Sequence, residues 1–172
     1  LEQLENPKPE LATRVYSIDG ELLENFYFKN RTHVAYEKIP QHLIDALIST
    51  EDKDFYDHWG VTPWRFIRAM VKNVLSLRLR EGASTITQQL SRNLYNLQHT
   101  RENAFDKMTR KFREFITSVQ IERTFTKKEI LEMYLNIIYL GRSAYGISAA
   151  SSIYFNTSAE ELSLGEAAML IG

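Results

Sequence analysis

The residues best suited to chemistry lie between Glu51 and Gly60, where four carboxylates and an imidazole stand beside three aromatic rings. Glu51 follows directly on an apolar helical run, so we expect its carboxylate at the edge of the core, where it could accept or give a proton. An acidic helix end would explain Asp54 and Asp57 but not the aromatic residues. His58 has no second His or Cys nearby, which favours a structural role over metal ligation.

A second stretch, residues 82–90, reads Gly-Ala-Ser-Thr-Ile-Thr-Gln-Gln-Leu and carries three hydroxyls and two carboxamides but no charge. Gly82 followed by Ser84 predicts a loop entering an N-capped helix, in which Ser84 or Thr85 accepts from the first free backbone N–H groups. Such a helix start attracts anions. A polar turn that only caps a helix is the alternative interpretation.

The third stretch is Arg110-Lys111-Phe112-Arg113-Glu114. On a helix Arg110 and Glu114 face one way together with Lys111, so the cations would keep Glu114 ionised and could hold phosphate oxygens. An ordinary surface ion pair is the alternative. Taken together, the three stretches suit displacement at a sugar carbon that bears a phosphate leaving group. One carboxylate would remove the attacking hydroxyl's proton while cations and backbone dipoles stabilise the leaving charge.

The charge is distributed unevenly along the 172 residues. Residues 61–128 hold 14 Lys and Arg against 5 Asp and Glu, whereas the remainder holds 7 against 17. The net charge is only −1, yet the middle of the chain is strongly basic. This pattern favours a polyanionic partner such as a phosphate, a diphosphate or an anionic membrane surface.

Composition excludes several other classes of site. The chain has no cysteine, so it can form neither a disulfide nor a thiolate metal site. It contains no phosphate loop, dinucleotide fingerprint or paired-His zinc site, so nucleotide chemistry is not expected. No apolar run approaches the roughly 20 residues that span a bilayer. The chain begins at Leu1 and ends inside an apolar run, and we expect it to be a piece of a longer protein.

The elements that must position these residues are mostly helical. Asp19-Gly20 between two short extended runs predicts a β-hairpin near the N-terminus. The clearest helix spans residues 102–124, with an apolar stripe at three- and four-residue steps: Phe105, Met108, Phe112, Ile116 and Val119. The other expected helices are 42–50, 64–79 and 128–140, followed by a small-residue segment over 144–152 and a further segment over 160–172. The expected fold class is mostly α with a short N-terminal hairpin.

Five ordered motifs resemble those of the peptidoglycan glycosyltransferases, the family 51 transglycosylase domains of class A penicillin-binding proteins and of their monofunctional relatives. The first three are Glu51-Asp-x-x-Phe55-x-x-His58-x-Gly60, Gly82-x-Ser84-Thr85-Ile86-Thr87-Gln88-Gln89-Leu90 and Arg110-Lys111-x-x-Glu114. The fourth and fifth are Lys128-x-Ile130-Leu131-Glu132-x-Tyr134-Leu135-Asn136 and Gly141-Arg142-x-x-Tyr145-Gly146-Ile147-x-Ala149-Ala150. The likeness runs in order from about Tyr16 to the end of the chain.

The resemblance implies a lysozyme-like helical fold with a small membrane-facing jaw. Residues 1–40 would form a linker and hairpin, and residues 41–172 a glycosyltransferase domain truncated at its C-terminus. The reaction would join lipid II to a growing glycan strand through a β-1,4 bond, with inversion and release of undecaprenyl diphosphate.

The resemblance also implies roles for individual residues. Glu51 would activate the acceptor's 4-hydroxyl, and Glu114 with Arg110 and Lys111 would support the donor diphosphate. The other implied substrate-binding residues are Asp52, Phe55, His58, Gly82, Ser84, Thr85, Thr87, Gln88, Gln89 and Arg92. Arg92 stands where relatives often have Lys, and its planar fork is not interchangeable with an ammonium. The resemblance implies no metal site and no required cofactor, although Mg or Mn could assist the diphosphate.

The expected partners are lipid II, the nascent glycan strand, a membrane surface and phosphoglycolipid inhibitors of the moenomycin type, with no nucleic acid. The expected location is the external face of the bacterial cell membrane, with an anchoring N-terminal segment missing from this chain. We expect residues 73–83 to be poorly ordered without ligand.

Two other functions compete with this interpretation. A lysozyme-like lytic glycoside hydrolase would also pair a carboxylate with a glycan groove, but a neutral leaving group needs no basic band. A non-catalytic membrane-surface module would use the amphipathic segment 64–79, but it leaves Glu51 and the two glutamines of residues 88–89 unexplained.

Overall fold

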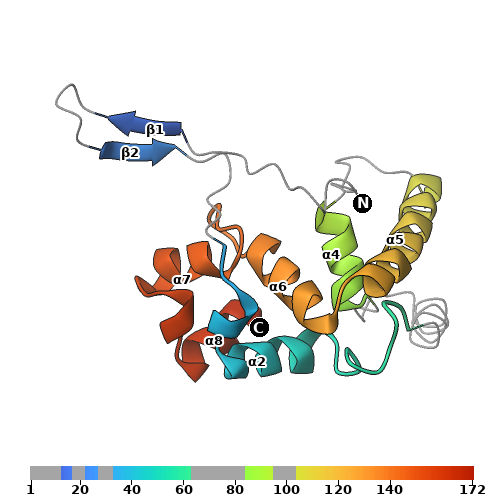
Figure 1. The fold of residues 1–172 in the computed structure, drawn as a ribbon. Coiled ribbons are helices and arrows are strands. Elements are labelled where there is room, and N and C mark those ends of the chain that lie inside the picture. Colours follow the sequence, from blue (N-terminus) through green and yellow to red (C-terminus); the bar gives the residue numbers. More distant parts are fainter. Residues whose placement is uncertain (1–12, 17–21, 27–32, 63–83, 95–103) are drawn as a thin grey trace.

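The computed structural model describes residues 13–16, 22–26, 33–62, 84–94 and 104–172, which form helices and one small sheet (Figure 1). The described helices are α2 (Gln41–Glu51), α4 (Ile86–Leu94), α5 (Ala104–Thr124), α6 (Lys127–Ile137), α7 (Ile147–Phe155) and α8 (Leu164–Ile171). Two short 3-10 turns are η1 (Tyr36–Lys38) and η2 (Ala159–Glu161). The predicted mostly helical fold class is confirmed. The helix expected over 64–79 and the segment 73–83, expected to be poorly ordered without ligand, lie outside the described residues.

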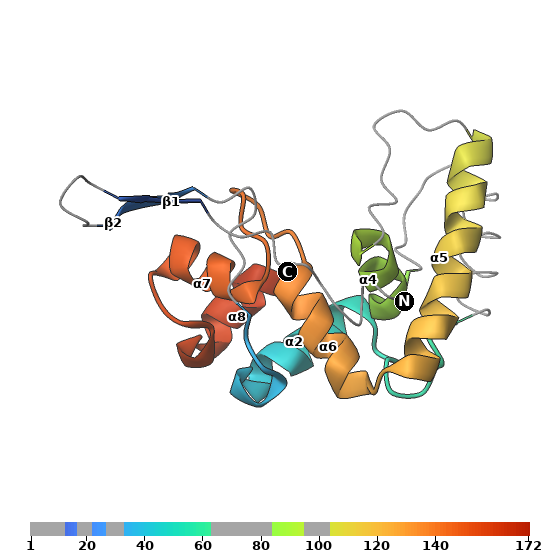
Figure 2. The same cartoon turned by 45° about the horizontal axis from the view of Figure 1, so that its top comes forward.

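The predicted hairpin is present as two paired strands. β1 (Thr13–Tyr16) and β2 (Leu22–Phe26) are antiparallel, with an irregularity in register between Val15 and Tyr16. The Asp-Gly turn itself lies outside the described residues. In both views the strands stand apart from the helical body (Figures 1 and 2). The core described below is therefore built by helices.

α6 lies at the centre of the helical body, between the group α2, α7 and α8 and the pair α4 and α5 (Figure 2). α2 packs on α8, and α4 packs on both α5 and α6. Each fully buried aliphatic side chain contributes about 1.5–3 kcal/mol to stability. The fully buried core side chains that join these helices are Leu43, Ile44, Leu47, Ile86, Leu90, Ile121, Ile130, Leu131, Tyr134, Leu135 and Ile147. This shared core fixes α2, α4, α5 and α6 relative to one another.

Capping residues set where two helices begin. Thr126 and Glu129 form a reciprocal capping box at the start of α6, and Ser163 and Glu166 form another at the start of α8. α6 consequently begins one residue before the expected start at 128. The segment expected over 160–172 is divided in the structure between the η2 turn and α8, because Ser163 caps the start of α8.

α6 also ends earlier than the expected residue 140, because the chain folds back after Ile137. Gly146 N–H donates to the Ile138 carbonyl at 2.8 Å. Gly146 has φ +83°, and a Cβ there would lie 2.5 Å from the backbone oxygen of Asn136. A side chain at this position would therefore be both strained and in collision with backbone.

Asn136 connects α6 to the segment that precedes α2. Its Oδ1 accepts from Val34 N–H at 2.8 Å, and its Nδ2 donates to the Val34 carbonyl at 2.8 Å. The same Nδ2 donates to the Glu132 carbonyl at 2.8 Å. The carboxamide thus pairs with the backbone of Val34 as a neighbouring strand would, across 102 positions of sequence.

The apolar stripe expected on the 102–124 helix does not face the core over its described part. In α5, Phe112 is 66% exposed and Ile116 is 43% exposed. The buried positions of the same helix include Glu114, Ser118 and Ile121. The inward face of α5 instead carries Glu114, which pairs with Arg92 of α4 and with Arg110 and Lys111 of its own helix. This orientation places Glu114 among the cations of the site described below.

Candidate active site

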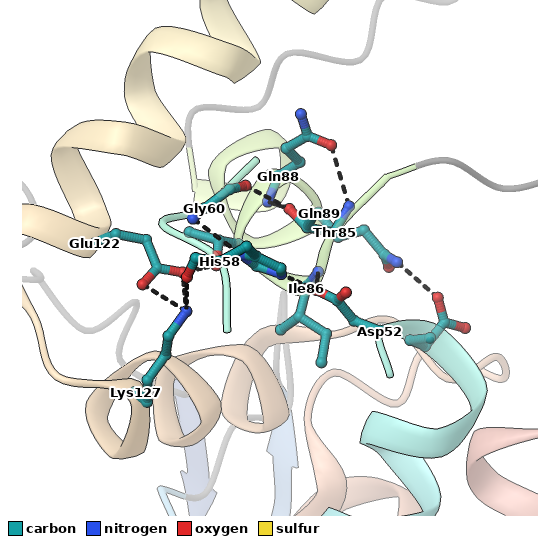
Figure 3. A network of polar contacts seen from close by, with 11 residues as sticks. Asp52, His58, Gly60, Thr85, Ile86, Gln88, Gln89, Glu122 and Lys127 are labelled. Atoms are coloured by element: carbon teal, nitrogen blue, oxygen red, sulfur yellow. Dashed lines mark hydrogen bonds and ion pairs between the residues drawn. The ribbon is translucent and has the colours of Figure 1, made fainter. Parts of the chain in front are cut away.

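α4 begins with the cap that the sequence predicts, and Thr85 is the residue that makes it. Gln88 N–H donates to Thr85 Oγ1 at 3.1 Å, and Gln88 Oε1 accepts from Thr85 N–H at 3.1 Å. The pair is a capping box in which Gln occupies the usual acidic position. The Thr85 hydroxyl donates in turn to the Gly60 carbonyl at 2.6 Å (Figure 3). The Thr85 side chain and the Gln88 oxygen are therefore engaged within the protein.

Asp52 is fully buried and supports the same helix start. Its Oδ2 accepts from Ile86 N–H at 3.1 Å and from His58 Nε2 at 2.8 Å. His58 Nδ1 accepts from Gly60 N–H at 3.0 Å, so the proton of a neutral ring belongs on Nε2. A carboxylate at a helix N-terminus is favoured by the free N–H groups there. Asp52 and His58 thus hold α4 against the end of α2, and the structural role predicted for His58 fits this position.

Phe55 and Thr87 also point into the protein. Phe55 is fully buried, and Lys127 Nζ lies 4.4 Å from its ring centroid. Thr87 Oγ1 donates to Glu122 Oε1 at 2.6 Å, and Lys127 Nζ lies 2.8 Å from Glu122 Oε2. Lys127 Nζ also donates to the His58 carbonyl at 2.7 Å. The contacts among Thr87, Glu122 and Lys127 hold α4 against α5 and α6.

Glu51 is the last residue of α2, is half-buried, and is held by α4. Gln89 Nε2 donates to Glu51 Oε2 at 2.6 Å. Tyr134 OH, from α6, donates to Gln89 Oε1 at 2.9 Å. Gln88 and Gln89 extend in different directions from α4 (Figure 3), so the two adjacent carboxamides serve different groups. Three helices therefore meet at the carboxylate that the sequence identifies as the candidate base.

Glu114 is fully buried at the centre of a cluster of three cations. Its Oε1 accepts from Arg110 Nη1 at 2.6 Å and from Arg92 Nε at 3.0 Å, and its Oε2 accepts from Lys111 Nζ at 2.8 Å. Lys111 Nζ also donates to Ser84 Oγ at 3.1 Å. We call these five residues the cation cluster.

The charge state of Glu114 follows from this environment. Burial by itself raises the pKa of a carboxyl, but the hydrogen bond and positive charge of Lys111, together with those of Arg92, outweigh it and lower the pKa of Glu114. Glu114 is therefore a fixed anion. It orients its three cations and offsets part of their charge, leaving the cluster net positive.

One face of α4 carries both the residue that holds Glu51 and a member of the cation cluster. Burial raises the pKa of Tyr134 above its ordinary value, the negative charge of Glu51 raises it further, and the positive charge of Arg92 opposes them. Gln89 and Arg92 are three positions apart on α4 and so share a face. The structure thus brings an acid–base candidate and an anion-binding group to one side of one helix.

The predicted site residues consequently fall into three sets. Glu51 and Gln89 form one contact, and Ser84, Arg92, Arg110, Lys111 and Glu114 form the cation cluster. Asp52, Phe55, His58, Thr85 and Thr87 lie buried around the start of α4, where they position it. Gln88 joins that last set through its oxygen. Gly82 lies outside the described residues.

Sequence reasoning about the site missed Tyr134. The available signal was a tyrosine among aliphatic residues on the buried side of a helix, because a buried phenol requires a hydrogen-bond partner. Glu122 and Lys127 were missed as well, since their partners Thr87 and His58 are distant in sequence.

Two kinds of feature are absent from the described residues. Within them, no group of three or more His, Asp or Glu side chains could hold a metal ion. None of the helices described for this chain combines the length and apolar character needed to cross a membrane.

Comparison with known proteins gives the family. A family model described as Transglycosylase matches residues 19–172. Penicillin-binding protein 1A of Aquifex aeolicus (strain VF5) is 44% identical over 167 residues, which cover 97% of this chain and 22% of that protein. Penicillin-binding protein 1A of Neisseria flavescens is 43% identical over 172 residues, covering 100% of this chain and 21% of that protein. The chain spans about a fifth of the length of these relatives, and it belongs to the transglycosylase family.

Proposed function

We propose that this chain is a peptidoglycan glycosyltransferase unit that joins lipid II to a growing glycan strand. The acceptor's 4-hydroxyl would attack the anomeric carbon of the donor as the carbon–oxygen bond to the diphosphate breaks. The products would be a β-1,4 bond formed with inversion and undecaprenyl diphosphate. The observation that carries the proposal is a half-buried carboxylate, Glu51, held by Gln89 on the face of α4 that also carries Arg92 of the net positive cation cluster.

Glu51 suits the part of general base. Gln89 holds its Oε2, and within the described residues Oε1 receives no hydrogen bond, so an oxygen remains for the acceptor's hydroxyl. A base must lie within hydrogen-bond reach of the proton that it removes. Its attachment to the end of α2 and to α4 gives it one fixed position.

The cation cluster suits the leaving diphosphate. A guanidinium has five N–H donors and an ammonium has three, so Arg92 and Lys111 keep donors for phosphate oxygens beyond those that they give to Glu114 and Ser84. Positive groups that are already oriented stabilise a developing charge without reorganising at the moment of reaction. Glu114 holds these cations in their orientation from its buried position at the centre of the cluster. The same groups would receive the phosphate of a moenomycin-type phosphoglycolipid.

A lytic hydrolase is less well supported by this geometry. Glycoside hydrolases use two carboxyl groups, one as an acid and one as a base or nucleophile. Glu114 is bonded to three cations, and Lys111 and Arg92 lower its pKa, which is the opposite of what a general acid needs. Glu114 therefore does not suit the second role that a hydrolase requires beside Glu51.

The chemistry of the substrate also determines where the reaction would take place. A lipid-linked substrate places the reaction at a membrane surface, and peptidoglycan places it at the external face of the bacterial cell membrane, with an anchor outside this chain. We propose no resident cofactor. If Mg²⁺ or Mn²⁺ assists the diphosphate, it would arrive with the substrate.

The test is Glu51→Gln, assayed by release of undecaprenyl diphosphate and by glycan length from lipid II. Removing a general base is expected to lower turnover by about 10²–10⁴-fold, while lipid II binding measured separately stays within about threefold. Glu160→Gln, at an exposed ion pair with Lys38, is the matched control and should keep full activity. Near-normal polymerisation by Glu51→Gln would overturn the assignment. Cleavage of preformed glycan without lipid II would favour the hydrolase.

A further inference from the structure

Tyr134 lies one step behind the candidate base and does not reach the surface. Its side chain is 1% exposed, and its hydroxyl donates to Gln89 Oε1 at 2.9 Å. The other end of the same carboxamide donates to Glu51 Oε2 at 2.6 Å. We propose that Tyr134 is a positioning residue for the reaction, fixing through Gln89 the orientation of the Glu51 carboxylate. The inference rests on the proposed function of Glu51 as base.

The argument starts from what each group can donate or accept. An ionised carboxylate only accepts hydrogen bonds, so a Gln89 that serves Glu51 must present its amide nitrogen. The Gln89 oxygen is then directed at Tyr134, and only a donor can satisfy it there. A phenol that keeps its proton is such a donor, and the hydroxyl can rotate to suit.

Without the Tyr134 hydroxyl, the Gln89 carboxamide would lose the hydrogen bond that fixes its oxygen. The Gln89 oxygen would be left without a donor, and the carboxamide could turn away from Glu51 to reach one. Glu51 would then lack its only described hydrogen bond and could leave the position beside the acceptor. A displacement of about 1 Å at a reacting group can cost about a hundredfold in rate.

Among the described residues, Gln89 is the hydrogen-bond partner of the Tyr134 hydroxyl. The charged groups that influence its hydroxyl are Glu51, from α2, and Arg92, from α4. Arg92 is itself held by Glu114, from α5. Burial raises the pKa of Tyr134, so the phenol remains a donor across the range in which an enzyme would be assayed. Because Tyr134 is buried, any effect on catalysis must pass through its neighbours.

The test is a double-mutant cycle with the kinetics of lipid II polymerisation as the readout. Tyr134→Phe should lower kcat by about tenfold and leave KM for lipid II within about twofold, because only the base is displaced. Gln89→Leu should lower kcat at least as far. Tyr134→Phe added to Gln89→Leu should then cause no further loss, since its only route of action is gone.

Tyr154→Phe is the matched control, because it also deletes one phenol hydrogen bond, to the Leu140 carbonyl, away from this network. It should leave kcat and KM unchanged. Values of kcat are referred to the folded fraction measured by circular dichroism at the assay temperature. If Tyr134→Phe folds too poorly to assay, Gln89→Leu removes the same hydrogen bond from the other side, and a normal kcat there would overturn the inference.

Equal losses from Tyr134→Phe in the wild-type and Gln89→Leu backgrounds would also overturn it, as would a rise in KM at constant kcat. These outcomes are separable from failure of the proposed function. If Glu51→Gln is active, the assignment of Glu51 as the base is wrong. If Glu51→Gln is inactive but Tyr134→Phe is fully active, only the positioning role of Tyr134 is wrong.

Discussion

Glu114 combines complete burial with three cationic partners, which is an expensive arrangement at the scale of a single residue. Taking charges out of water costs several kcal/mol per ion and is offset only by good geometry. A hydrophobic residue would pack there at no such cost. The arrangement is understandable if its product is a set of cations held in fixed positions.

Glu114→Gln should therefore destabilise the chain at neutral pH, by about 3 kcal/mol, because it leaves the cluster without its counter-charge. The pKa of Glu114 in the fold lies below its ordinary 4.5, so its stabilising effect is complete above that value. That effect is lost as the pH falls through the lowered pKa. The stability gap between wild type and variant should narrow below about pH 4.5. Thermal unfolding at several pH values measures it, and a gap independent of pH would contradict the argument.

Single residues also show what could be predicted from the sequence. The pairing of Arg110 and Lys111 with Glu114 follows from helical spacing, and the structure contains it. The inward direction of Thr87 could not be predicted, because its partner Glu122 is 35 positions away. Local spacing determines which residues share a face, but only the tertiary packing determines what that face meets.

At the scale of elements, α4 connects every part of the site. Its first turn is held by Thr85 and Asp52, its middle carries Gln89, and its last turn carries Arg92. The sequence indicates this helix start correctly. It also suggests that the surplus hydroxyls and carboxamides contact the substrate. Part of that surplus is instead spent on capping the helix.

Gln88 separates the two uses. Gln88→Ala should cost about 0.5–1 kcal/mol, because the Thr85 N–H loses its acceptor. Gln88→Glu keeps an oxygen at that place and adds a favourable charge at the helix start, so its stability should equal or slightly exceed that of the wild type. Denaturant unfolding checks both values.

Activity of the same two variants then reports on the Gln88 amide nitrogen. If that nitrogen contacts the donor, Gln88→Glu should be stable yet slow. A stable and fully active Gln88→Glu would restrict Gln88 to capping. Gln88→Glu carries the comparison, because it lacks the amide nitrogen and is expected to be as stable as the wild type.

The α5 helix shows where periodicity misleads. Its aromatic stripe predicts a buried face, yet Phe112 is among its most exposed residues and Glu114 is fully buried. Hydrophobic periodicity ranks faces by the cost of leaving them in water. It does not include the energy of a charge network between two helices. The helix was therefore predicted correctly and its rotation was not.

At the scale of the whole molecule, Asn136 joins parts of the chain that are distant in sequence. Asn136→Ala should remove three hydrogen bonds and leave the Val34 backbone unpaired, at a cost of about 2–4 kcal/mol. Amide exchange at Val34 should become much faster than in the wild type. Gln41→Ala, which removes a surface bond to Asp45, is the control and should change neither quantity. Unaltered protection at Val34 would show that other contacts hold this segment.

The position of α4 limits which insertions and deletions the chain can tolerate. A helix turns by about 100° per residue, so one amino acid inserted between Thr85 and Gln89 would rotate everything beyond it to another side. Gln89 would leave Glu51, and Arg92 would leave Glu114, in a single event. Substitutions in this helix can be graded in their effects, whereas a one-codon insertion or deletion would be all-or-none. Length variation should therefore be tolerated on either side of residues 84–94 before it is tolerated within them.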